Sequence, residues 1–426
     1  MHRKKMENKW EVLGIINGCF CIITIMIFNP WVVPKFMSTT GKILPFTQLL
    51  IMILDILFAF MCLFSFKYRK SDIFKNFLLI QISIFICTPL IGEVVFRTGV
   101  SLKIPYFFQA RLYFDPYSTE AFWKINAKWT KIIQTDQYKS KSAVKLIRDR
   151  ILGWAPEKTL SNPLGIITDK PYNYDSQEKV ILFFGDSYVE GFTLMNDKLP
   201  QQIDKLLTDH KVYNLGVFGY GLCQTYLRFK EVSSKFKSPI ILFGILTEDI
   251  DRTILGFRDD FKPYYSVENG KLLLKGVPID KSKNTRVYLD NYNPNIRSYF
   301  YAFIKERYKI IIGNNGWGKE RKEEKIRVNS MLIAKIINEA QKNHQKIIFI
   351  IFYRLEELKK PSWRVDFLKK EIKKSLGIYI DTGAILIEKA KENSIDFDDL
   401  FELGHPNELA NRIMAKSIAM KIKKYL

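Results

Sequence analysis

A serine at the end of an apolar run has the setting of a nucleophile. Residues 180–184 are apolar and lead into "GDSYVEGF", in which Ser187 follows a glycine and an aspartate. A serine just past the carboxyl end of a strand, where a helix begins, lies among outward-pointing backbone N–H groups that stabilise an alkoxide and a developing oxyanion. Serine is also a common helix N-cap, so this segment alone leaves both roles open.

A general base for this serine has one strong candidate among the four histidines. His405 follows the acidic stretch "DFDDLFELG" and immediately precedes the last predicted helix. A catalytic histidine needs an acidic partner that holds its tautomer and stabilises the imidazolium. Glu402 is close enough in sequence to be that partner, and Asp399 is the alternative. A histidine that merely starts a helix is the competing interpretation.

A glycine-rich turn, "NLGVFGYG", forms the third feature. Gly216, Gly219 and Gly221 follow a predicted strand, at positions where side chains would obstruct the approach of a ligand to the backbone. The spacing G-x-x-G-x-G differs from the dinucleotide pattern G-x-G-x-x-G. The sequence therefore predicts an anion-binding turn.

The elements that must position these residues alternate along the chain after residue 177. Continuous apolar strands separated by amphipathic helices predict a parallel sheet with helices on both faces, and chemistry in such sheets collects at the carboxyl ends of the strands. An insertion at 256–307 contains a predicted hairpin. The predicted strands are 179–184, 212–215, 240–245, 346–352 and 378–381, and the predicted helices are 199–209, 224–236, 322–342, 362–375, 382–393 and 407–425.

The first hundred residues have a different character. Segments 12–33, 43–66 and 76–96 carry no charge apart from Asp55 and Glu93, and their lengths are near the roughly 20 residues that cross a bilayer. We predict three transmembrane helices. Pro89, Gly92 and Glu93 interrupt the end of the third, for which a buried helix of a soluble domain is the alternative. Lys and Arg concentrate before the first segment and between the second and third, which places the C-terminal domain outside the cytoplasm.

Composition excludes several other classes. The net charge of +22 would suit nucleic acid, but the basic residues are scattered and no nucleic-acid-binding motif is present, so we expect attraction to an anionic membrane surface and no nucleic-acid partner. Four of the five cysteines lie in the apolar segments and leave Cys223 alone, which excludes a disulfide network in the C-terminal domain. The irregular aromatic stretch 98–177 is expected to be a connecting subdomain.

Taken together, the motifs resemble those of the SGNH or GDSL-like serine hydrolase family. The resemblance covers residues 179–426 and rests on "FFGDSYVEGF", "NLGVFGYG" and "ELGHPN", the last in place of the family's D-x-x-H block. It extends to a membrane-anchored branch found in bacterial envelopes. The resemblance implies a flavodoxin-like α/β fold at 178–426, after a membrane anchor at 1–97 and the connector at 98–177.

The resemblance also implies roles for individual residues. Ser187 would be the nucleophile, His405 the general base and Glu402 its orienting acid, with the backbone N–H groups of Ser187 and Gly219 in the oxyanion hole. No metal or organic cofactor is implied. One block departs from the family pattern, because Glu248 stands where the family has an asparagine. A carboxylate cannot donate a hydrogen bond to an oxyanion, so Thr247 is the alternative donor.

These features predict a serine esterase of the bacterial cytoplasmic membrane with its catalytic domain on the extracytoplasmic side. Its expected partners are the lipid bilayer and an acylated, above all acetylated, glycan or lipid of the envelope. Two alternatives remain open at this point. The same serine would serve an O-acyltransferase, and Glu248 would suit a catalytically silent glycan-binding module.

Overall fold

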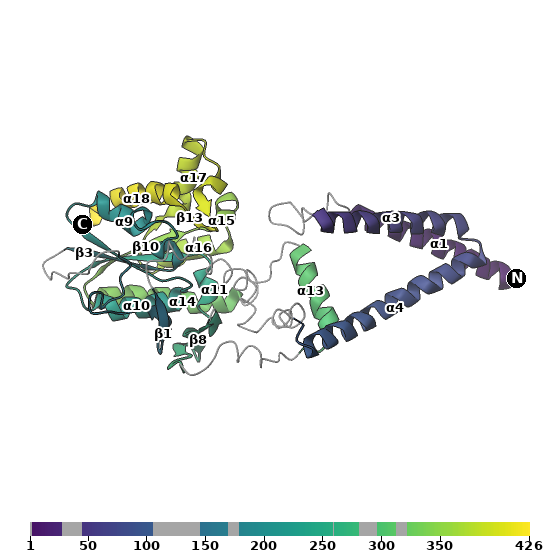
Figure 1. Cartoon of the computed structure of the whole chain (residues 1–426), viewed down its shortest axis with the longest axis horizontal. Coiled ribbons are helices and arrows are strands. Elements are labelled where there is room, and N and C mark those ends of the chain that lie inside the picture. The colour runs from purple at the N-terminus through teal and green to yellow at the C-terminus, as the bar shows by residue number, and fades with distance from the viewer. Residues whose placement is uncertain are drawn as a thin grey trace. The chain divides into compact units, whose positions relative to one another are not determined.

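The chain is organised in two units (Figure 1). The computed structural model describes residues 2–27, 45–104, 145–168, 179–258, 260–280, 296–311 and 322–426. The first unit comprises Met1–Ala121 and Asn293–Glu320, and the second comprises Phe122–Tyr292 and Arg321–Leu426. The predicted connector, 98–177, lies largely outside the described residues.

The second unit is built on a five-stranded parallel sheet. The strand order is β11-β10-β5-β3-β4. Numbered by their order in the chain, these strands run 5-4-3-1-2 across the sheet, which is the flavodoxin-like order read from the other edge. The predicted α/β fold of this part of the chain is therefore confirmed. The strands are β3 (Val180–Gly185), β4 (Lys211–Gly216), β5 (Ile240–Leu246), β10 (Lys346–Phe352) and β11 (Ile378–Asp381).

Uninterrupted apolar side chains explain why these segments form the centre of the fold. Every residue of β3 and β5 is buried, which requires cover on both faces of the sheet. In Figure 1, α9 and α18 lie on one side of the sheet and α10 and α14 on the other. The helices that cover the sheet are α9 (Leu199–Leu206), α10 (Leu222–Ser233), α14 (Lys322–Lys342), α16 (Trp363–Lys374), α17 (Thr382–Glu392) and α18 (Glu408–Ile422).

Short elements at the ends of the strands carry the loops around the sheet. The predicted hairpin is present as β8–β9, and its turn residues Asn269 and Gly270 have φ values of 50° and 74°, as a two-residue hairpin turn requires. The short elements are β1 (Leu146–Asp149), β2 (Gly153–Pro156), α8 (Ser187–Glu190), α11 (Asp249–Arg252), β6 (Phe257–Arg258), β7 (Asp260–Phe261), β8 (Tyr264–Glu268), β9 (Lys271–Lys275), α15 (Leu355–Lys359), β12 (Phe401–Glu402) and β13 (His405–Pro406).

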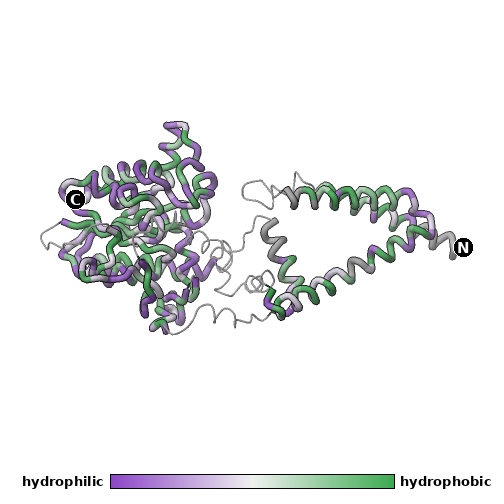
Figure 2. The backbone as a smooth tube through the Cα atoms, viewed as in Figure 1, coloured by the Kyte–Doolittle hydropathy of each residue, from purple (hydrophilic) through white to green (hydrophobic). Residues whose placement is uncertain are grey.

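The first unit consists of α1 (His2–Ile27), α3 (Pro45–Tyr68), α4 (Asp72–Ser101) and α13 (Tyr299–Ile311). The side chain of Asn17 on α1 joins three helices, because its amide nitrogen donates to Ser65 Oγ on α3 and to Gln81 Oε1 on α4, each at 2.9 Å. Figure 2 shows hydrophobic residues along most of α3 and much of α1 and α4. Among the described residues, α4 is the one helix long and apolar enough to cross a membrane, and 11–26 is a shorter apolar stretch.

The end of α4 differs from expectation. The helix continues through Pro89 and Gly92 to Ser101, whereas the sequence suggested an irregular end. A side chain at Gly92 would lie 2.3 Å from the ring of Phe300, so the glycine allows α13 to pack closely. Glu93 Oε2 accepts hydrogen bonds from Ser298 Oγ at 2.8 Å and from the Phe300 N–H at 2.9 Å. Gly92 and Glu93 at the end of the apolar segment therefore form the contact of α4 with α13.

The predicted insertion 256–307 is divided between the two units. Its hairpin belongs to the second unit, and α13 belongs to the first.

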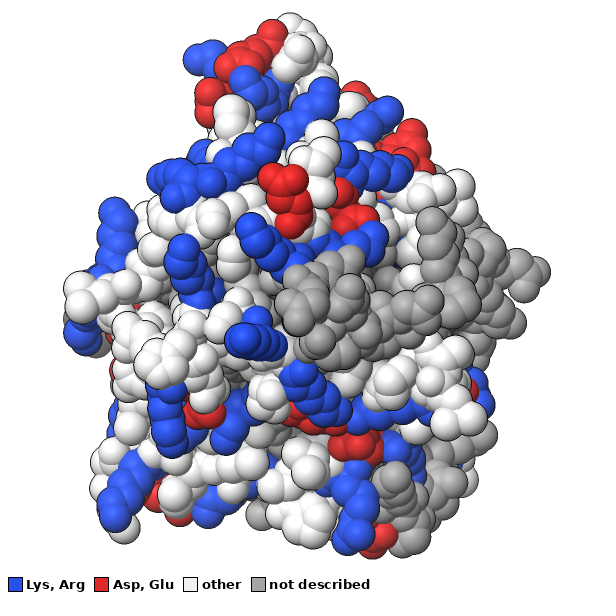
Figure 3. All heavy atoms as spheres, turned by 90° about the vertical axis from the view of Figure 1, so that its left-hand side faces the viewer, with Lys and Arg blue, Asp and Glu red and all other residues white. Residues whose placement is uncertain are grey.

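The surface charge of the second unit is dispersed, because Figure 3 shows Lys and Arg spread over the visible face with Asp and Glu among them. No extended basic surface is seen on the described part of that face.

Candidate active site

Ser187 lies where β3 gives way to α8. Asp186, and not the serine, caps this helix, because Asp186 Oδ1 accepts the Tyr188 N–H at 2.9 Å. Ser187 is the first helical residue, and its own N–H makes no hydrogen bond with another described residue. The hydroxyl group is thus free of the capping duty that the sequence left open for it.

The structure brings Ser187 and His405 together across 218 residues of sequence. His405 Nε2 lies 2.9 Å from Ser187 Oγ, and both side chains are buried. The imidazole stacks on the ring of Phe192, with a centroid distance of 4.0 Å, and lies at 5.3 Å from the ring of Tyr188. These contacts hold His405 against Ser187, the two residues that the sequence proposed as general base and nucleophile.

A tight turn between β12 and β13 sets the position of His405. Leu403 and Gly404 occupy the turn with φ values of 52° and 79°, and the Leu403 carbonyl lies 3.2 Å from His405 Nδ1. The Tyr188 hydroxyl donates to the Gly404 carbonyl at 2.9 Å, which joins the turn to the nucleophile helix. A backbone carbonyl at Nδ1 favours the tautomer with the proton there and a lone pair on Nε2.

Burial makes the charged form of His405 a stronger acid and its neutral imidazole a weaker base. Desolvation lowers the pKa of the imidazole to about 4, with the charge of Arg252 acting in the same direction and the Leu403 carbonyl opposing. The imidazole is therefore neutral at pH 7 and can accept a proton from Ser187.

The two carboxylates proposed to orient His405 lie in different settings. Glu402 faces His405 in the short β12–β13 ladder. The sequence alone does not reveal that the Leu403 carbonyl lies at Nδ1 of His405. The role of Glu402 as the acid that orients His405 stays a prediction. The side chain of Asp399 is exposed, and its backbone carbonyl accepts a hydrogen bond from Asn407 Nδ2 at 2.7 Å.

The glycine-rich turn lies beside the nucleophile because β3 and β4 are neighbours and their last residues, Gly185 and Gly216, pair in register. The Tyr220 N–H donates to the Val217 carbonyl at 3.2 Å, and Gly219 has φ +77°. Its N–H makes no hydrogen bond with another described residue. The arrangement suits the oxyanion role that the family resemblance implies for this N–H group.

The other two glycines serve a different purpose from the one expected. A side chain at Gly216 would lie 2.2 Å from the Glu190 backbone nitrogen, and one at Gly221 would lie 2.6 Å from Arg252 Cβ. These glycines admit neighbouring parts of the protein, so the expectation that they admit a ligand was wrong.

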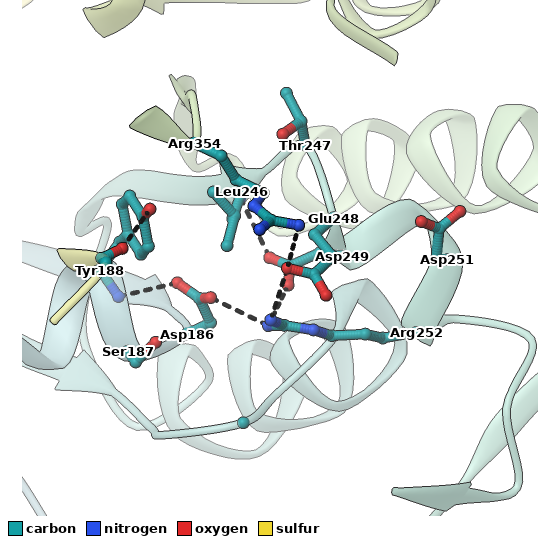
Figure 4. A network of polar contacts seen from close by, with 12 residues as sticks. Asp186, Ser187, Tyr188, Leu246, Thr247, Glu248, Asp249, Asp251, Arg252 and Arg354 are labelled. Carbon is teal, nitrogen blue, oxygen red and sulfur yellow. Dashed lines mark hydrogen bonds and ion pairs between the residues drawn. The ribbon is translucent and has the colours of Figure 1, made fainter. Parts of the chain in front are cut away.

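Arg252 on α11 is the residue on which the site is centred, and nothing in the sequence pointed to its role (Figure 4). Its Nη1 donates to Asp186 Oδ2 at 3.0 Å, to Asp249 Oδ1 at 2.8 Å and to the Tyr220 carbonyl at 3.0 Å. These acceptors lie on the loops after β3, β5 and β4. The side chain of Arg252 is 6% exposed and those of the two aspartates 1%. One buried guanidinium thus joins the three loops that carry the predicted motifs.

Glu248 does not leave an uncompensated negative charge in the site. Its carboxylate lies 3.4 Å from Arg252 and 3.6 Å from Arg354, and Figure 4 shows the Arg354 side chain directed toward it. Burial acts to raise the pKa of Glu248, but the charges of Arg252 and Arg354 outweigh it and lower the pKa to about 2. Glu248 is therefore ionised and paired.

Thr247 is not supported as an oxyanion donor. Its side chain is fully buried, and the hydroxyl donates to the carboxylate of Glu357. The single proton of the hydroxyl is therefore already used within the protein.

The chain is similar to a known family and to several solved structures. The model of the family described as GDSL-like Lipase/Acylhydrolase matches residues 181–418. No curated protein matches the sequence. Similar solved structures include a member of the lipolytic protein G-D-S-L family from Veillonella parvula, 16% identical, with a TM-score of 0.34, covering 58% of this chain and 100% of its own.

Two further solved structures are named as esterases. The acetylxylan esterase Axe2 from Geobacillus stearothermophilus is 14% identical, with a TM-score of 0.35, covering 57% of this chain and 94% of its own. The psychrotrophic esterase EstA from Pseudoalteromonas sp. is 11% identical, with a TM-score of 0.34, covering 58% of this chain and 98% of its own.

We predict that Arg252→Met destabilises the protein by about 3–5 kcal/mol, because two buried carboxylates lose their counter-charge. Arg252→Lys should recover part of this loss, since an ammonium keeps the charge but not the planar fork. Urea unfolding followed by tryptophan fluorescence measures both changes. Arg412 on α18 is exposed, and Arg412→Met is the matched control. Equal stability of the Arg252 and Arg412 variants would contradict the role of Arg252.

The pH dependence of the site follows from the depressed pKa of His405. A base with a pKa of about 4 stays neutral below the ordinary histidine value of 6.5. We expect kcat/KM for an uncharged ester to stay level from pH 7 to pH 5 and to fall about tenfold per pH unit below the pKa. An acid limb centred near pH 6.5 would contradict this environment for His405.

The lowered pKa of His405 also predicts that the folded protein becomes less stable as the pH falls. Between pH 6.5 and about 4 the unfolded chain binds a proton at this histidine and the folded chain does not. The stabilising contribution is therefore present above pH 6.5 and is lost as the pH falls toward 4. Activity at low pH is accordingly measured in short assays, with circular dichroism verifying that the protein remains folded.

Proposed function

Because the chain belongs to the GDSL-like lipase/acylhydrolase family, we propose that it is a membrane-tethered serine esterase that removes acyl, above all acetyl, groups from an envelope glycan or lipid. The family is established by the match over residues 181–418. The observation that carries the proposed chemistry is the 2.9 Å contact between Ser187 Oγ and His405 Nε2. This distance is that of a hydrogen bond between a nucleophile and its base.

Acylation begins when Ser187 Oγ attacks the ester carbonyl carbon and its proton passes to His405 Nε2. The carbonyl oxygen becomes an oxyanion, which the N–H groups of Ser187 and Gly219 stabilise. Neither N–H group is engaged by another described residue. Collapse of the tetrahedral intermediate breaks the bond to the alcohol, which leaves with the proton from the imidazolium.

Deacylation repeats these steps with water as the nucleophile and Ser187 as the leaving group. Water attacks the acyl-serine carbonyl while His405 accepts a proton from the water, and a second oxyanion forms in the same hole. Collapse returns the proton to Ser187 Oγ and releases the carboxylic acid. In this scheme Glu402 supports the imidazolium electrostatically, as its place opposite His405 allows.

The pairing of Glu248 bears on whether the site is catalytic. An unpaired carboxylate near the hole would repel the oxyanion and would favour a silent binding module. Arg252 and Arg354 lie on either side of Glu248 and compensate its charge. We therefore favour catalysis with two backbone donors over a binding module.

The membrane tether rests on the apolar surface of the first unit. Exposed large apolar side chains on α4 include Leu79, Ile80, Ile82, Leu90 and Ile91, and soluble proteins rarely leave such surface uncovered. The same holds along α3 for Leu54, Ile56, Leu57, Phe60 and Leu63. The distribution of Lys and Arg in the sequence supports an extracytoplasmic catalytic domain.

Labelling by a fluorophosphonate probe tests the nucleophile. We expect detergent-purified protein to be labelled covalently and Ser187→Ala and His405→Ala to remove the labelling, because the serine needs a base to become nucleophilic. In-gel fluorescence is the readout. Ser233, which is also buried, provides the control Ser233→Ala, which should be labelled like the wild type.

The outcome also separates the alternatives. A folded wild type that resists labelling would favour the binding module. If the wild type reacts with the probe, unlabelled protein is then given an acetyl ester donor together with a glycan. Transfer of the acetyl group to the glycan faster than to water, measured by mass spectrometry of the products, would replace the esterase by an O-acyltransferase.

Membrane attachment has its own test. We expect the full chain to stay in the membrane fraction after alkaline carbonate washing, because the exposed apolar surface of α3 and α4 would be buried in lipid. Protease added to intact spheroplasts should remove a C-terminal tag if the catalytic domain is extracytoplasmic. Release by carbonate would contradict the tether, and a protected tag would contradict the sidedness.

A further inference from the structure

Trp154 of β2 contacts the backbone of the oxyanion turn. Its indole Nε1–H donates to the Phe218 carbonyl at 2.8 Å, and the side chain is 8% exposed. This residue lies outside the segment that matches the family model, in the aromatic stretch to which the sequence assigned no chemistry. The indole therefore reaches the turn from a separate part of the chain.

The acceptor of this hydrogen bond matters because of the geometry of the peptide unit. The Phe218 carbonyl and the Gly219 N–H belong to the same planar trans peptide, so they point in opposite directions. Trp154 holds the carbonyl on one side and thereby directs the Gly219 N–H to the other. That N–H is the group assigned to the oxyanion.

Glu190 holds the preceding peptide unit of the turn, the one that contains the Phe218 N–H. It is the last residue of α8, three residues after Ser187, and its side chain is buried. Its Oε2 accepts the Phe218 N–H at 2.5 Å. The helix that carries the nucleophile thus holds the turn that carries the donor, which fixes the distance between them.

The two carbonyls that follow are held as well. Arg258 Nη1 donates to the Gly219 carbonyl at 2.7 Å, and Arg252 Nη1 donates to the Tyr220 carbonyl at 3.0 Å. Three successive carbonyls of the turn therefore have side-chain donors. The Gly219 N–H in their midst is left without a partner among the described residues.

Trp154 is itself held in place by the turn it contacts. The Tyr220 hydroxyl donates to the Trp154 carbonyl at 2.6 Å, and the two rings meet edge to face at 5.9 Å. Gln224 Nε2 donates to the Leu152 carbonyl at 2.8 Å. Leu152, Trp154, Val217 and Tyr220 form a buried cluster, so the β1–β2 hairpin and the turn are one packed assembly.

We propose that Trp154 and Glu190 are positioning residues that aim the Gly219 N–H at the oxyanion formed on Ser187. The inference rests on the proposed esterase function and gives positioning roles to Glu190, within the "GDSYVEGF" motif, and to Trp154, outside the segment that matches the family model. Its physical content is preorganisation: a donor already directed at the developing charge needs no reorganisation during the reaction.

The test compares variants of the full-length protein in detergent. Trp154→Phe keeps the ring and removes the N–H, Glu190→Ala removes the acceptor, and Glu190→Gln keeps an acceptor oxygen. We expect Trp154→Phe and Glu190→Ala to lower kcat on p-nitrophenyl acetate about 10- to 100-fold with KM nearly unchanged. Glu190→Gln should restore most of the loss. The rate of fluorophosphonate labelling should fall in parallel with kcat.

Trp363 at the start of α16 supplies the matched control, since Trp363→Phe changes the same residue type away from the turn and should leave kcat unchanged. Wild-type kcat in both Trp154→Phe and Glu190→Ala would overturn the positioning role while leaving the esterase intact. A failure of Glu190→Gln to recover activity that Glu190→Ala has lost would also overturn it. If Trp154→Phe does not fold, the two Glu190 variants decide the question.

The failure of the proposed function has a different signature. Wild type that neither hydrolyses the ester nor reacts with the probe would overturn the serine esterase and, with it, this inference.

Discussion

The buried guanidinium of Arg252 is the interaction on which the arrangement of the site depends. It lies at the carboxyl end of the sheet and donates to groups from three separate loops, those after β3, β4 and β5. Each loop carries one piece of the proposed machinery or its support: Ser187, Gly219 and Glu248. A buried charge is tolerated only when it is paired and hydrogen-bonded. The carboxylates of Asp186 and Asp249 meet that requirement and in doing so fix the loops relative to one another.

Burial makes the charge of Arg252 costly, and burial also disfavours the charged form of His405. His405 is packed against Phe192 and Tyr188 and its charged form is disfavoured, so the base is neutral when it meets the serine. Its Nδ1 lies at a backbone carbonyl supplied by a tight turn. The Tyr188 hydroxyl donates a hydrogen bond that joins this turn to α8, the helix that begins at Ser187. Nucleophile and base therefore share one set of contacts.

The first unit shows how a segment inserted in the catalytic sequence can belong elsewhere in the structure. Helix α13 follows β9 in the chain, yet it packs on α4 of the first unit, where Glu93 accepts hydrogen bonds at its N-terminal end. The chain thus runs between the two units before β1, before α13 and again before α14. An acidic residue in an apolar segment, which the sequence left without a role, is explained by this cap.

Much of the fold followed from the sequence by itself. Short continuous apolar runs that alternate with amphipathic helices predicted buried strands covered on both faces, and β10, β11 and α14 have the bounds that were predicted. The motif "GDSYVEGF" singled out Ser187 and the scarcity of histidines singled out His405, because few residue types can carry out this chemistry. The structure brings the two side chains together, and their catalytic roles stay predictions. Periodicity and residue type are local properties, and they are legible without a structure.

The tertiary structure alone decided which groups meet. Contacts such as Arg252 with Asp186, Trp154 with Phe218 and Thr247 with Glu357 join segments distant in sequence, and no spacing rule encodes them. The sequence offered Thr247 as a donor because its hydroxyl could serve, but the fold had already engaged that proton. It presented Glu248 as an obstacle because Arg354, one of the two arginines that compensate it, becomes its neighbour only when the sheet brings β5 and β10 side by side.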